Sequence, residues 1–145
     1  LCKTKLNARN LMKAVNEYAI SVINYYVGII NYEEKELQEL DLEIRRIFLE
    51  NKIIRKSSNT ERIYFPRSEL GRGLRNIEDT AEVMLMTLHN NLKSSHTTKT
   101  IIEAEVESQT LLGRIHQHIH QKYPTEEEEQ MNAKTLKEKQ TKKRI

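Results

Sequence analysis

Apolar residues recur at intervals of three and one residues from Leu6 to about Ile30, which is the spacing of one face of an α-helix. The stripe consists of Leu11, Ala14, Val15, Tyr18, Ala19, Val22, Ile23, Tyr26, Val27 and Ile30. Tyr25 and Ile29 widen it near its end, a pattern typical of burial on more than one side. This pattern predicts one long amphipathic helix at the start of the chain.

A second helix is predicted directly after the first. Asn31 followed by Glu34 has the form of a capping box, in which each side chain satisfies a backbone N–H of the first turn. The helix is expected to run to about Asn51 or Ile54, with a stripe made of Leu37, Leu40, Ile44, Ile47 and Phe48. Because the connection is short and polar, the two helices are expected to form an antiparallel hairpin.

The segment 56–75 differs in character from the helices around it. Residues 57–60 are a turn-like cluster of Ser, Asn and Thr, and Pro66 biases Phe65 away from helical backbone angles. Residues 62–67 are therefore predicted to be a short extended segment. Gly71 and Gly73 indicate a tight backbone path. The sequence predicts a short extended loop, rich in basic residues, proline and glycine, between the second and third helices.

Beyond this loop the chain is predicted to return to helix. A third helix starts at about residue 77, with a stripe made of Ile77, Ala81, Met84, Leu85, Leu88 and Leu92. Residues 93–100 are polar and predict a linker, and residues 101–123 predict a further helix that ends before Pro124. The tail then carries acidic residues first and basic residues last, which suits a solvated helix.

The predicted fold class is therefore mostly α: a helical hairpin plus further helices. The expected organisation is a helical region over 1–92, a polar linker over 93–100 and a charged helical tail of unknown role over 101–145. The charged tail is the candidate binding site for a protein partner.

Composition narrows the class of protein. Of 145 residues, 37% are hydrophobic, and no run approaches the roughly 18 apolar residues of a membrane span. Basic residues from Lys3 to Lys13 interrupt any signal-peptide pattern.

Cys2 is the one cysteine, which excludes a disulfide within the chain and favours a reducing compartment, the nucleus or the cytoplasm. Since residue 1 is Leu, the chain is expected to be a fragment of a longer protein.

Candidate catalytic and metal sites are weak. Gly71 and Gly73 lack the third glycine of a dinucleotide fingerprint, because position 76 is Asn, so a sharp turn is the preferred interpretation. His116 and His120 share a helix face, but two ligands do not complete a zinc site, and a polar face is preferred. No serine lies in a glycine-flanked nucleophile elbow. We therefore predict no catalytic residue, no metal ligand and no cofactor in this chain.

The strongest candidate site is a cluster of basic residues. Although the net charge is only +3, the segment 52–75 carries basic side chains against only two acids, Glu61 and Glu69. The candidate nucleic-acid contacts are Lys52, Arg55, Lys56, Arg62, Tyr64, Arg67, Arg72 and Arg75. Guanidinium groups suit phosphate oxygens, and aromatic rings can stack on bases. Taken alone, however, Tyr64 and Phe65 are more typical of core anchors that hold an extended segment against helices.

Several motifs resemble the region after the palm in non-LTR retrotransposon reverse transcriptases, closest to the site-specific elements that carry a restriction-like endonuclease. They lie at residues 5–10, 14–20, 25–30, 37–41 and 45–46, then at 62–67 and 71–74 with 77–79 behind them. The last part is similar to the family's Arg-Leu-Tyr-Leu-Pro-Arg … Gly-Gly-Arg-Gly-Leu element, with Ile63 and Phe65 as mild departures. Leu70 stands where that element has its first glycine.

The resemblance covers roughly residues 5–92 and implies the thumb and connector of an RNA-directed DNA polymerase. It implies a template–primer duplex of RNA and DNA as the partner, with Arg67, Arg72 and Arg75 as backbone or structural contacts. The parent polymerase would need Mg²⁺, held by an Asp-Asp motif that this chain lacks. The chain is expected to be inactive alone.

A stand-alone α-helical interaction protein, or a decayed remnant of a retroelement without a nucleic-acid role, is the alternative.

Overall fold

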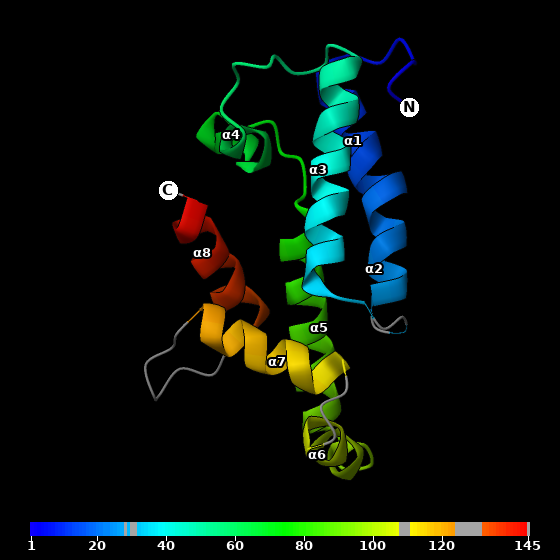
Figure 1. Ribbon diagram of the computed structural model, residues 1–145. Helices are drawn as coiled ribbons and strands as arrows, with labels where there is room; N and C mark the ends of the chain where they lie inside the picture. Colours follow the sequence, from blue (N-terminus) through cyan, green and yellow to red (C-terminus); the bar gives the residue numbers. More distant parts are fainter. Residues whose placement is uncertain (28, 30–31, 108–110, 124–131, 145) are drawn as a thin grey trace. The chain divides into compact units, whose positions relative to one another are not determined.

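The computed structural model describes residues 1–27, 29, 32–107, 111–123 and 132–144, without the side chains of 105–107, 111–113, 115 and 116. All regular structure in these residues is helical (Figure 1), which confirms the predicted fold class. The helices are α1 (Ala8–Ala14), the π-helix η1 (Val15–Ile20), α2 (Ser21–Val27), α3 (Glu34–Glu50), α4 (Glu61–Tyr64), the 3-10 helix η2 (Arg67–Glu69), α5 (Ile77–Ser94), α6 (Lys99–Glu107), α7 (Leu111–Lys122) and α8 (Ala133–Arg144).

The chain divides into two compact units. The first unit comprises Leu1–Tyr25 and Glu33–Glu78, and the second comprises Tyr26–Tyr32 and Asp79–Ile145. None of the described helices combines the length and apolar character that a membrane span requires.

The first predicted helix is continuous from α1 through η1 to α2. Asn7 caps its start, because the Asn7 side chain accepts a hydrogen bond from the backbone N–H of Asn10 at 2.9 Å. The buried face is not the predicted stripe throughout: Tyr18 is 71% exposed, whereas Ile20 is fully buried. The wider π-turn of η1 explains this difference, because it rotates the following residues away from the 3.6-residue register that the prediction assumed.

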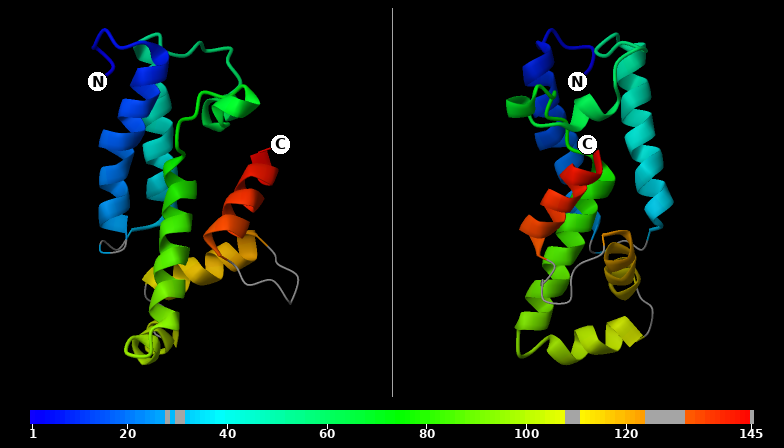
Figure 2. Two further views of the ribbon diagram at one scale, coloured as in Figure 1. Left: turned by 180° about the vertical axis from the view of Figure 1, so that it is seen from behind. Right: turned by 90° about the vertical axis from the view of Figure 1, so that its left-hand side faces the viewer.

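The predicted antiparallel hairpin is present in the first unit. In two views, α3 runs alongside the first helix in the opposite direction (Figure 2). A cavity of about 440 Å³ is lined by both helices and by the chain start, with the half-buried Cys2 among its residues. Its apolar lining includes Val15, Ala19, Ile44, Ile47 and Phe48.

The start of α3 differs from the prediction. The residue that caps it is Glu33, whose backbone N–H donates to the Glu36 carboxylate at 3.0 Å. Asn31, the predicted cap, lies outside the described residues. The capping box is therefore formed by Glu33 and Glu36, two residues later than predicted, because Glu36 is the acid that reaches back to the helix start.

The end of α3 has a specific turn geometry. The N–H of Ile53 donates to the carbonyl of Phe48 at 2.9 Å, and the N–H of Lys52 donates to the carbonyl of Leu49 at 3.1 Å. This pair of bonds is a Schellman motif, which places Lys52 at a left-handed φ of 56°. The motif ends α3 and sends the basic segment away from the helix axis.

In the second unit, two predictions for the C-terminal part are wrong. Residues 101–123 contain two helices, α6 and α7, on either side of 108–110, rather than one. The tail does form a helix, α8, but this helix is not simply solvated: Leu136 is fully buried and Gln140 is 7% exposed. Gln140 donates to the carbonyl of Asp79 at 2.9 Å and to the Glu82 carboxylate at 3.0 Å. Among the described residues of α8, Leu136 is the buried apolar side chain, and amide and ion-pair contacts hold the helix beside it.

The buried face of α5 is more polar than predicted. Within the second unit it combines Ala81, Leu85 and Met86 with Glu82 and His89. Glu82 pairs with Lys122 of α7 at 2.5 Å, and Arg144 of α8 pairs with Asp79. Of these four charged residues only Glu82 is buried, and a buried carboxylate persists because it is paired and hydrogen-bonded. Met84, a member of the predicted stripe, is 37% exposed.

Candidate nucleic-acid interface

The basic segment folds back on itself after a short helix. Three backbone bonds join its two arms: Arg72 N–H to Arg62 O at 3.0 Å, Gly73 N–H to Phe65 O at 2.9 Å, and Leu74 N–H to Ile63 O at 3.0 Å. We call residues 62–74, closed by these bonds, the basic loop. Its chain reversal places residues that are far apart in sequence beside one another.

The predicted extended segment over 62–67 is shorter than expected. Residues 61–64 form α4, and the Asn59 side chain accepts the N–H of Glu61 at 3.0 Å in a turn directly before this helix. Only Phe65 and Pro66 are extended, with ψ values of 147° and 152°. The restriction that Pro66 imposes on Phe65 is thus confirmed, but it does not extend further back along the chain.

Three positions of the basic loop have geometry that favours glycine. Leu70 has a left-handed φ of 61° and Gly73 a φ of 72°. At Gly71, an added Cβ would lie 1.9 Å from the carbonyl oxygen of Phe65, a distance no side chain can occupy. The sharp turn preferred over a nucleotide-binding loop is what the structure has at these residues.

Two polar side chains from the hairpin fix the end of the loop. The Asn16 amide donates to Gly73 O and accepts from Arg75 N–H, both at 2.8 Å. The carboxylate of Asp41, which is 4% exposed, accepts the N–H groups of Ile77 at 2.8 Å and Glu78 at 3.2 Å. Asp41 therefore caps α5 from α3, where its negative charge also suits the helix N-terminus.

Two of the candidate arginines bind the protein's own backbone. Arg62 Nε donates to Leu70 O at 3.0 Å, and Arg72 Nη1 donates to Ile53 O at 3.2 Å. Arg72 is also half-buried. Arg67 is exposed, with its side chain beside Gly73. These contacts give Arg62 and Arg72 a role in holding the loop, a distinction that the sequence could not make.

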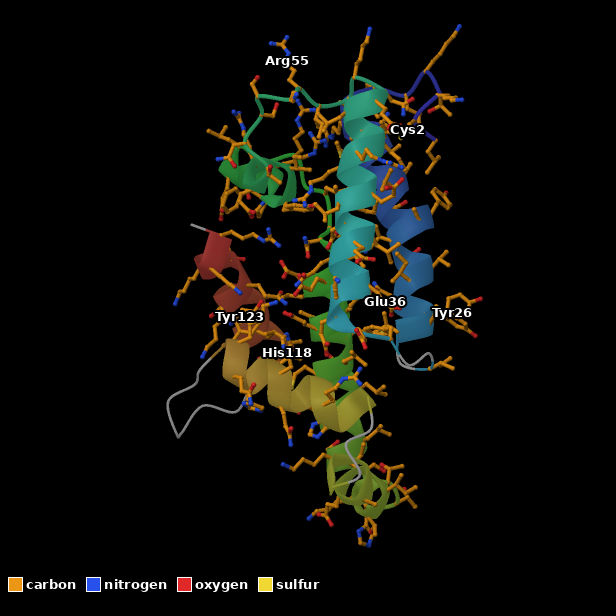
Figure 3. The ribbon with its side chains drawn as sticks, in the orientation of Figure 1. Cys2, Tyr26, Glu36, Arg55, His118 and Tyr123 are labelled. Carbon is orange, nitrogen blue, oxygen red and sulfur yellow. The ribbon has the colours of Figure 1, made fainter. Side chains whose placement is uncertain are left out.

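A groove of about 350 Å³ lies between the C-terminal half of α3 and the segment that follows it. We call it the basic groove. Its apolar side chains are Leu42, Leu49, Ile54 and Ile63, and its polar ones are Arg45, Arg46, Arg55, Lys56, Ser58 and Thr60. Arg55 extends outward from the segment between α3 and α4 (Figure 3).

The charges of the basic groove are only partly balanced. Arg46 pairs with Glu43 at 2.5 Å and with Glu50 at 3.8 Å, and the hydrogen bond and charge of Glu43 raise the pKa of Arg46 above its ordinary value. Arg45, Arg55 and Lys56 form no ion pair with any residue that the structure describes. The groove therefore presents unneutralised positive charge next to hydroxyl groups, a combination suited to phosphate oxygens.

The remaining candidates lie outside this groove. Lys52 and Arg75 are exposed, and Tyr64 is half-buried with its hydroxyl shielded from solvent. That placement suits an anchor for α4 better than a platform for a base. Sequence reasoning did not propose Arg45 and Arg46 as site residues, although two adjacent arginines just before a basic segment were a usable signal.

The histidines considered as metal ligands are on α7. His120 is half-buried, and the side chain of His116 lies outside the described residues.

Comparison with protein-family models, with curated proteins and with solved structures gives no match to this chain.

Proposed function

We propose that this chain is the thumb and connector part of a retrotransposon reverse transcriptase, with no catalysis of its own. In this role it would bind the phosphate backbone of a duplex of RNA template and DNA primer, while the Mg²⁺-dependent chemistry would belong to a palm on the parent polymerase. The nucleus or the cytoplasm would be its compartment. The proposal rests on residues 5–92, which carry the resemblance.

The observation that carries the binding proposal is the unneutralised charge of the basic groove. Arg45, Arg55 and Lys56 have no carboxylate partner among the described residues, and Arg55 and Lys56 are exposed. Each cation that neutralises a phosphate releases counterions from the nucleic acid, so such a cluster favours polyanion binding.

The backbone geometry of the basic loop adds support for the resemblance. The family element has glycine at the positions of Leu70, Gly71 and Gly73, and these are the positions with a left-handed φ or no room for a Cβ. In this chain the backbone favours glycine at all three positions, including position 70, where the residue is leucine, and this supports the proposal.

The test is binding of the chain to a fluorescent RNA–DNA hybrid across a range of salt concentrations. We expect the combined variant Arg45→Gln, Arg55→Gln and Lys56→Gln to bind weakly and to lower the salt slope by about 0.7–0.9 per lost contact. The matched control replaces three exposed lysines of α8, Lys134, Lys137 and Lys142, by Gln. It removes the same charge from the chain and should retain the wild-type slope.

If the groove variant and the α8 control lose the same affinity for the hybrid, the effect comes from the net charge of the chain. That result would contradict a specific interface. Arg62 and Arg72 are left unchanged in this design because their bonds to Leu70 and Ile53 would confound binding with folding.

A protein-interaction role is the second candidate, favoured by an exposed apolar stripe on the first helix. Tyr18, Val22 and Tyr25 share one face and are 71%, 52% and 71% exposed. Exposed aromatic residues in such a row are typical of interaction surfaces. Sedimentation tests this candidate: self-association that is lost in Tyr18→Ser with Tyr25→Ser would support it, and a strict monomer with no protein bound would count against it.

A further inference from the structure

We propose that Ser58 is a phosphorylation site for an ATP-dependent protein kinase that selects basic substrates, and that the added phosphate is held in the basic groove by Arg45, Arg55 and Lys56. The regulatory part of this inference, loss of nucleic-acid binding, rests on the proposed function. The modification and the retention of the phosphate do not.

Ser58 is accessible in the way that a kinase requires. It is exposed and lies in the segment between α3 and α4, outside any helix. Its own backbone N–H donates to Arg55 O at 2.9 Å, a single turn bond that a kinase would have to open. The neighbouring residues 55–57 and 59–60 are also exposed, so the whole segment can enter a cleft.

The residues before Ser58 carry the charges that direct such a kinase. Arg55 is three positions and Lys56 two positions before the hydroxyl, and neither forms an ion pair with a described residue. Kinases discriminate substrates by charge patterns, and a cleft lined by carboxylates binds guanidinium and ammonium groups at fixed offsets from the acceptor. Ser57 has the same two cations one position closer, a different offset.

The lining of the basic groove is a second difference between Ser58 and Ser57. Ser58 lines the basic groove together with Arg45, Arg55 and Lys56, whereas Ser57 does not line it. A phosphoserine carries about −1.5 to −2 charges at neutral pH and three strong acceptor oxygens. Arg46 is already paired with Glu43 and Glu50, so the other three cations are the ones open to the phosphate.

The chemistry is a balanced phosphoryl transfer with ATP as co-reactant. The Ser58 Oγ forms a bond to the γ-phosphorus, and the bond from that phosphorus to the bridging oxygen of ADP breaks. The hydroxyl proton leaves to a base on the kinase, and ADP is the second product. Nothing is oxidised or reduced.

The physical consequence is that the phosphate offsets more than about half of the groove's unpaired positive charge. The phosphate supplies the anion that a nucleic-acid phosphate would otherwise supply, and it does so without the entropy cost of a second molecule. Phosphorylation would therefore compete with binding of the RNA–DNA hybrid at the same side chains.

The first measurement maps the modification. The full chain is incubated with ATP and the catalytic subunit of cyclic-AMP-dependent protein kinase, and the phosphorylated residue is located by mass spectrometry. We expect phosphate on Ser58, full loss of it in Ser58→Ala and no loss in the matched control Ser57→Ala. Arg55→Gln should slow the reaction by about tenfold, because the kinase loses one charge-assisted hydrogen bond to its substrate. No incorporation, or incorporation at Ser57 instead, would overturn the proposal.

The second measurement tests whether the groove holds the phosphate. A ³¹P titration of the phosphorylated chain should give a second pKa below the ordinary value of about 6. Arg45→Gln should return it toward that value while leaving the rate of phosphorylation unchanged, because Arg45 is on α3 and outside the segment that the kinase reads. An ordinary pKa in the wild type would contradict retention.

Hybrid binding supplies the third readout and separates the two proposals. Phosphorylation should weaken binding by at least about tenfold, since it neutralises several phosphate contacts. If the phosphorylated and unmodified chains bind equally well, the regulatory part is wrong. If the unmodified chain binds no hybrid, the proposed function fails, while the mapping and the ³¹P titration still decide whether Ser58 is the site.

Discussion

At the scale of the single residue, backbone conformation and side-chain contacts define roles that residue type leaves open. Leu70 and Lys52 both have left-handed φ values, where a side chain costs about 1 kcal/mol relative to glycine. Arg62 and Arg72 bond to backbone carbonyls, whereas Arg55 and Lys56, of the same charge and in the same segment, line the groove without an ion pair to a described residue. Charge alone in the sequence did not separate these two groups.

The left-handed position at residue 70 gives a direct stability prediction. Leu70→Gly should raise the free energy of unfolding by about 0.5–1 kcal/mol, because it relieves the strained φ and Leu70 is 78% exposed, so little burial is lost. The midpoint of urea unfolding measures this change. Leu70→Ala is the control, since it keeps the Cβ and should give no such gain. Equal gains in both variants would contradict the explanation.

At the scale of the element, the structure joins helices through a few polar contacts. Asn16 connects η1 to the end of the basic loop, and Asp41 connects α3 to the start of α5. Both residues belong to polar positions that a periodicity analysis treats as solvent-facing. They define where the loop ends and α5 begins.

Removal of the buried cap on α5 should be costly. Asp41→Ala leaves the N–H groups of Ile77 and Glu78 without their acceptor, with an expected loss of about 1–3 kcal/mol in the free energy of unfolding. Thermal unfolding followed by circular dichroism measures the loss. Glu39→Ala, at an exposed position of the same helix, should change stability by less than about 0.5 kcal/mol. A similar loss in the two variants would show that Asp41 is no special cap.

The packing of α8 provides a second prediction at this scale. Leu136→Ala should destabilise the chain by about 2–4 kcal/mol, because Leu136 is fully buried although the helix around it is highly charged. Urea unfolding measures the effect, and Lys137→Ala on the exposed side of α8 is the control. A neutral Leu136→Ala would mean that α8 is held by its polar contacts alone.

At the scale of the whole molecule, buried titratable groups link stability to pH. Burial lowers the pKa of His89 below its ordinary value of 6.5, aided by the charges of Lys93 and His120 and opposed by a hydrogen bond with Asn90. Burial also raises the pKa of Asp79 against the opposing effect of Arg144, and it raises the pKa of Tyr123. These groups couple folding of the second unit to protonation.

The chain should lose stability as the pH falls below about 6.5. In this range the unfolded chain binds a proton at His89 that the folded chain does not, so acidification favours unfolding. His89→Gln should flatten the dependence of the unfolding free energy on pH between about 7.5 and 5.5. Asp79 has the opposite effect on stability, because its pKa is raised in the folded chain from the ordinary value of 3.8. Both the wild type and His89→Gln contain Asp79, so it does not cause a difference between them. An unchanged slope in His89→Gln would contradict this assignment.

The sequence by itself determined the helical class, the hairpin and the tight glycine turn. Apolar spacing in residues 8–27 and 34–50 is strong enough to specify helices, and Pro66, Gly71 and Gly73 restrict the backbone locally. These signals depend on residues close together in the chain, which is why sequence analysis captures them. The prediction of a single helix over 101–123 was wrong, because the apolar stripe in that segment is weak.

Only the tertiary structure decided which residues share a surface. Contacts between residues far apart in sequence, such as Asn16 with Gly73 or Asp79 with Gln140, have no local pattern. The π-turn of η1 changed the buried face because its extra residue breaks the assumed period. The basic groove likewise combines Arg45 of α3 with Arg55 and Ser58 of the following segment, since the Schellman turn at Lys52 redirects the chain there. Local periodicity determines helices, whereas the site depends on how the chain turns between them.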